Sequence, residues 1–89
     1  MSEASAKFYF GNLAADVARC ISALELEHRD RFKDSLGRAY DTLEHLRGYP
    51  EAHEEGLLMI QGLIHAREQN NLKGFKEHLY NLVPPFPVA

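Results

Sequence analysis

Apolar residues recur along the chain at helical spacing, and this spacing divides it into segments. Between about residues 5 and 28, a stripe that includes Leu13, Val17 and Leu24 is typical of a helix buried on one side. No stretch alternates apolar and polar residues over the length of a strand. The pattern therefore predicts an all-α fold. Between residues 30 and 47 the apolar positions are spaced by four and three, as in a seam between two packed helices: Phe32, Leu36, Ala39, Leu43 and Leu46.

Two further helices are predicted in the second half of the chain. Gly48 is a suitable C-terminal cap for the second helix, and Pro50 opens a third helix that runs to about residue 69. Residues 72–82 form a short fourth helix, which the prolines after Val83 end. We expect these helices to form an antiparallel bundle of three long helices and a short fourth.

The joint between the first two helices leaves two alternatives open. No glycine or proline occurs between Asn12 and Leu36, and Asp30 is the one cap candidate there. A single helix of about 36 residues would be about 54 Å long and would need a partner chain. Because the stripe drifts off a continuous heptad seam, we favour a break at residues 28–31. A second break, at Gly37, would interrupt a regular seam and is less favoured.

Length and composition fit one small domain over residues 1–89, with a flexible N-terminus at residues 1–4. The chain is 45% apolar and 26% charged, which is a globular composition. Its net charge of −3 argues against binding to nucleic acid. The longest apolar run, residues 57–60, is too short to cross a membrane. With no visible signal peptide and the single cysteine Cys20, we expect a cytoplasmic protein.

The third helix is apolar on more than one side, and Leu58 points away from its two apolar stripes. Glycine in a helix interior costs about 1 kcal/mol relative to alanine, which is tolerated where another backbone approaches closely. The helix is therefore either the central helix of its own bundle or one that also packs against a second chain. We interpret its surplus apolar surface as the interface of a homodimer or of a complex with another protein. The predicted interface residues are Gly56, Leu58, Met59, Gly62, Leu63 and Ala66.

No residue pattern indicates catalysis, and we expect neither an enzyme nor a cofactor. The fingerprints of serine hydrolases, zinc proteases and nucleotide-binding loops do not occur. Cys20 lies on an apolar stripe, so we expect it to be buried and unreactive. Pairs such as Glu25 and His28, or Asp41 and His45, suit helix capping and ion pairing. A metal- or ligand-binding bundle that uses these pairs is the alternative function.

A basic cluster at the start of the second helix contains Arg29, Arg31, Lys33 and Arg38. Aspartates are interleaved with it, which disfavours a nucleic-acid groove. We expect a solvated helix face, or one complementary to the acidic turn Glu51, Glu54 and Glu55.

The chain ends in an extended, wholly apolar tail at residues 83–89, which contains three prolines. The tail either packs on the aromatic residues of its own bundle or serves as a ligand for a groove in another protein. We favour packing, because a further buried phenylalanine adds about 2 kcal/mol to a thin core. The tail residues concerned are Pro84, Pro85, Phe86 and Pro87.

Overall fold

A computed structural model describes residues 3–82 of the chain, and the side-chain surroundings of residues 5–79. Within this range it contains four helices and no strand: α1 (Glu3–Glu25), α2 (Arg29–His45), α3 (Pro50–Glu68) and α4 (Leu72–Leu82). The first three have 23, 17 and 19 residues and the fourth has 11, which confirms the predicted bundle of three long helices and a short fourth. None of these helices is long and apolar enough to cross a membrane.

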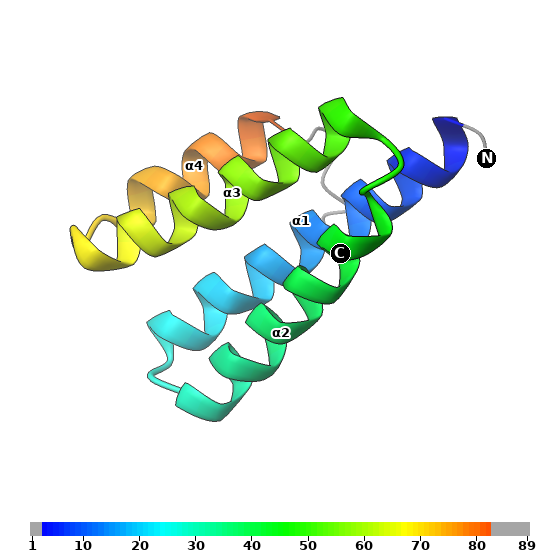
Figure 1. Ribbon diagram of the computed structural model, residues 1–89. Helices are drawn as coiled ribbons and strands as arrows, with labels where there is room; N and C mark the ends of the chain where they lie inside the picture. Colours follow the sequence, from blue (N-terminus) through cyan, green and yellow to red (C-terminus); the bar gives the residue numbers. More distant parts are fainter. Residues whose placement is uncertain (1–2, 83–89) are drawn as a thin grey trace.

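The helices form two hairpins that pack against each other (Figure 1). The pair α1–α2 is the most extensively packed, and the α3–α4 hairpin lies against one side of it. Both α1 and α3 contact the three other helices, whereas α2 and α4 do not contact each other. At the end of the bundle far from the α2–α3 loop, the Arg67 guanidinium lies 4.8 Å from the centroid of the Phe32 ring, so a cation–π contact joins the two hairpins.

The core is formed by the predicted apolar stripes. On α2, the seam residues Phe32, Ala39 and Leu43 are buried. On α1 the core also encloses a charged residue, Asp16, which is only 6% exposed. Its carboxylate accepts a 2.7 Å hydrogen bond from Arg19, which compensates for its burial. The largest side chains that are fully buried are Leu13, Val17, Cys20, Ile21, Leu46, Ile60, Leu63 and Leu79.

The favoured break between the first two helices is confirmed, but its cause differs from the expected one. Glu27 has a left-handed backbone, with φ of 58°. The His28 amide then donates to the Ala23 carbonyl at 2.8 Å, which closes α1 with a Schellman motif. His28 occupies the N-cap position of α2 and its side chain makes no capping bond, so the cap expected from Asp30 is absent.

At the other two joints between helices, some predicted features are present and others are not. Pro50 is the first residue of α3, as predicted. Gly48 is not the left-handed cap of α2, because the C-cap is Leu46 and none of the six glycines has a positive φ. A second Schellman motif ends α3, where Asn70 has φ of 54°. Helix α2 continues through Gly37 without interruption.

Candidate functional site

An apolar groove with a volume of about 460 Å³ lies between α1, α3 and α4. On α3, residues three and four apart face it and therefore share one side of the helix. Two polar side chains, Glu55 and His78, also line it. The full lining is Phe10 from α1, Glu55, Leu58, Met59 and Gly62 from α3, and Phe75, His78 and Leu79 from α4.

The Phe75 ring lies against Gly62, and this contact brings α4 close to α3. A Cβ atom added at Gly62 would lie 2.8 Å from Cε1 of the Phe75 ring. Any other residue at position 62 would therefore push the ring away and change the shape of the groove. The ring itself is only half-buried, so one of its sides is available to the groove.

Leu58 stands on the groove-facing side of α3 and is 58% exposed. Single exposed leucines are common on protein surfaces. This one differs because it adjoins a groove whose other apolar side chains come from three helices: Phe10, Met59, Phe75 and Leu79. Exposed and concave apolar surfaces are thus contiguous here, which is typical of interaction sites.

The six interface residues predicted from the sequence do not share one outer face. Leu58 is exposed, and Gly62 lies beneath Phe75. The other four, Gly56, Met59, Leu63 and Ala66, are buried within the chain's own bundle. Of the six, only Leu58 is exposed at the surface, and the groove lies beside it.

The close approach expected at Gly56 occurs inside the chain. A Cβ atom at this position would lie 2.5 Å from Cδ2 of Leu13 and 3.1 Å from Cδ1 of Leu43. Gly56 thus admits side chains from both α1 and α2. Its role is to let α3 pack onto the first hairpin.

The tail residues Pro84, Pro85, Phe86 and Pro87 lie outside the described residues. Both alternatives for the tail, packing on the bundle and binding to another protein, stay predictions.

The histidine–carboxylate pairs make other contacts than those of a metal site. The Glu25 carboxylate accepts a 3.5 Å bond from Lys76, which joins α1 to α4. The His45 ring stacks on Tyr9, with ring centroids 4.9 Å apart. Among the described residues, no three His, Cys, Asp or Glu side chains come together in a way that could hold a metal ion.

Cys20 is fully buried, as expected, and its thiol lies 3.9 Å from the Phe32 carbonyl oxygen. Burial raises the pKa of the thiol to about 11, and the negative charge of Asp16 acts in the same direction. A thiol with a raised pKa is protonated at neutral pH and is a poor nucleophile. Cys20 is therefore a core residue.

Comparison with known proteins adds no relative. No protein family, no curated protein and no solved structure matches the chain significantly.

Proposed function

We propose that this protein is a small, non-catalytic, cytoplasmic interaction module that self-associates through the groove between α1, α3 and α4. The observation that supports this proposal is the position of Leu58, which is 58% exposed at an apolar groove of about 460 Å³. Each copy thus offers both an apolar side chain and an apolar recess.

A symmetric dimer uses both features at once. In a two-fold interface the same patch lies on each side, so Leu58 of one copy enters the groove of the other and the reverse contact forms as well. Burying a leucine contributes about 2 kcal/mol, and the symmetry doubles this contribution. A standard interface covers about 800 Å² on each partner, so the aromatic residues Phe10 and Phe75 are expected to join the contact.

The test is the molar mass in solution, measured by light scattering behind a sizing column. Loading concentrations from about 1 µM to about 1 mM cover dissociation constants in the same range. These correspond to free energies of association between roughly −8 and −4 kcal/mol. The wild-type chain should change from monomer to dimer within this range. Leu58→Glu should stay monomeric, because the dimer would bury a carboxylate in the groove.

The chain offers a matched control. Leu26 is 61% exposed and does not line the groove, so Leu26→Glu introduces the same charge at an equally exposed leucine elsewhere. This variant should dimerise like the wild type. A wild-type chain that is monomeric at every concentration contradicts self-association, and equal loss in both variants contradicts the assignment to the groove.

A further inference from the structure

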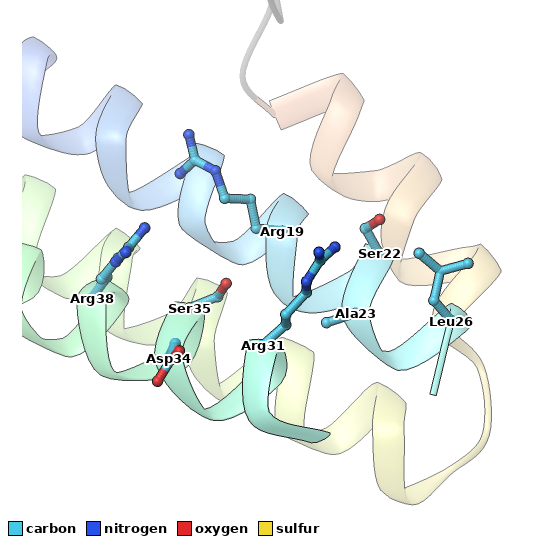
Figure 2. A pocket seen from close by; sticks show the side chains of 8 residues that line it. All are labelled: Arg19, Ser22, Ala23, Leu26, Arg31, Asp34, Ser35 and Arg38. Carbon is cyan, nitrogen blue, oxygen red and sulfur yellow. The ribbon is translucent and has the colours of Figure 1, made fainter. Parts of the chain in front are cut away.

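A second cleft, with a volume of about 280 Å³, lies between α1 and α2 and shares no lining residue with the apolar groove. It is lined by three arginines: Arg19 comes from α1, and Arg31 and Arg38 come from α2. Figure 2 shows Arg31 and Arg38 standing on α2 on either side of Ser35, with Arg19 on the facing helix. The packing of the first hairpin thus gathers charges that are distant in the sequence.

The positive charge of the cleft is only partly neutralised. Arg19 is engaged by Asp16 at 2.7 Å. Among the described residues, neither Arg31 nor Arg38 forms an ion pair. Asp34 is the one carboxylate in the lining, and with Asp16 on Arg19 it leaves the three arginines a formal charge of +1.

Ser35 supplies a second observation at the same place. It is only 7% exposed and lines the cleft, in a helix whose other buried residues are Phe32, Ala39 and Leu43. No hydrogen bond of its hydroxyl is found among the described residues. In Figure 2 the hydroxyl points toward the gap between the two helices. Although the residue is largely buried, its hydroxyl oxygen is not among the enclosed polar atoms that lack a partner, so it is accessible from the cleft and free to bond to a ligand or to water there.

We propose that the cleft between α1 and α2 binds a small anion that carries one or more phosphate groups. Guanidinium groups bind phosphate oxygens through two parallel hydrogen bonds, and the Ser35 hydroxyl adds a neutral donor between them. Arg31 and Arg38 are seven residues apart on one face of α2, a rise of about 10.5 Å, so their long side chains bracket the anion from both sides. Because the lining residues differ, this site is independent of self-association through the groove.

The experiment is a titration of the full chain with inorganic pyrophosphate and with inorganic phosphate, followed by amide NMR at constant ionic strength. We expect saturable chemical-shift changes at residues of the cleft, with a dissociation constant below about 1 mM. This corresponds to a binding free energy stronger than roughly −4 kcal/mol. Arg31→Gln and Arg38→Gln should each weaken binding about tenfold, since each removes a charge-assisted contact. Glutamine keeps the helix propensity of arginine, so both variants should fold.

Two further variants test the specificity of the site. Ser35→Ala should weaken binding by about two- to tenfold, the effect of one neutral hydrogen bond. Arg29→Gln removes the same charge from the same helix at an exposed position outside the cleft, and it should bind like the wild type. Arg19 is left unchanged because its loss would leave Asp16 buried without a partner.

Three results would overturn the proposal. One is the absence of saturation up to about 10 mM pyrophosphate. Another is a set of shifts spread over basic residues across the whole surface, which indicates charge screening only. The third is an equal loss of affinity in Arg29→Gln and in the two cleft variants.

Discussion

Gly56 of α3 lies so close to Leu13 of α1 that position 56 has no room for a side chain. A Cβ atom there would be 2.5 Å from Cδ2 of Leu13, and Leu13 itself is fully buried. The contact joins the two helices that each pack against all the others. It is therefore one of the contacts through which the two hairpins pack together.

Gly56→Ala should destabilise the protein even though alanine favours the helix. The gain in helix propensity is about 1 kcal/mol, whereas overpacking a tight core typically costs about 1–3 kcal/mol. Because Leu13 and Leu43 are both buried, neither side chain can move away cheaply. Urea denaturation followed by circular dichroism should show a net fall in the free energy of unfolding.

Gly37→Ala is the control for this prediction. Gly37 is exposed within α2, and no atom of the described residues lies within 4 Å of an added Cβ. This variant should gain up to about 1 kcal/mol from helix propensity alone. If Gly56→Ala were stabilised by as much as Gly37→Ala, the close packing at Leu13 would be contradicted.

Glu27→Gly should stabilise the fold. A left-handed backbone costs about 1–2 kcal/mol for an ordinary residue and little for glycine, although glycine also loses more entropy on folding. With φ of 58° at Glu27, we expect a net gain of about 1 kcal/mol in thermal or urea unfolding. Asn70→Gly should gain less, because asparagine tolerates φ of 54° better than glutamate does.

The matched control is Glu54→Gly, which removes an exposed glutamate from the interior of α3. Here the backbone is helical, so glycine should cost about 1 kcal/mol. Effects of the same sign at positions 27 and 54 would show that the left-handed turn does not strain the chain.

The turn at Glu27 also shows where prediction from the sequence ends. The drift of the apolar stripe predicts the break, yet no residue type marks the turn, since glutamate is not typical of a left-handed position. Residues 72–82 were placed as α4 because a strong period and the following prolines mark that helix. The apolar periodicity predicts the helices. It does not predict the exact position of a turn, which depends on backbone strain and on packing together.

The two candidate surfaces also combine residues that the sequence pattern predicts with contacts between helices that it does not predict. Leu58 was assigned to the interface because it points away from both apolar stripes of its helix. The groove beside it depends on how Phe75 lies over Gly62, and neither helix encodes this contact alone. Likewise, Arg31 and Arg38 belong to a basic cluster in the sequence, whereas Arg19 joins them only because α1 and α2 pack together.

Tyr49→Phe should preserve or raise stability. The Tyr49 hydroxyl is buried and finds no hydrogen-bond partner within the part of the chain that the structure describes. Such a group loses its bonds to water without compensation, so its removal should raise the free energy of unfolding by about 1 kcal/mol. The measurement is urea unfolding of the two proteins side by side. A loss of about 1 kcal/mol would instead show that the hydroxyl has a partner in solution.

Cys20 should make the protein less stable at alkaline pH. The pKa of its thiol is raised to about 11 in the folded state, from an ordinary value of 9.0. Between these values the unfolded thiol loses its proton while the folded thiol keeps it, so the unfolded state binds fewer protons. The free energy of unfolding therefore falls as pH rises above about 9, by up to about 1.4 kcal/mol per pH unit, and this contribution is constant below that pH.

Urea unfolding of the wild type and of Cys20→Ala at about pH 8 and about pH 10 isolates this contribution, because the two proteins differ only in the thiol. The wild type should lose more stability between the two pH values than Cys20→Ala does, whatever the loss of packing in the variant at the lower pH.

The buried thiol should also react with an aromatic disulfide reagent only as fast as the chain opens, so adding urea should accelerate labelling in step with unfolding. Rapid labelling in the absence of urea would mean that the thiolate is accessible in the folded state, and the alkaline loss of stability would then have to arise from other groups.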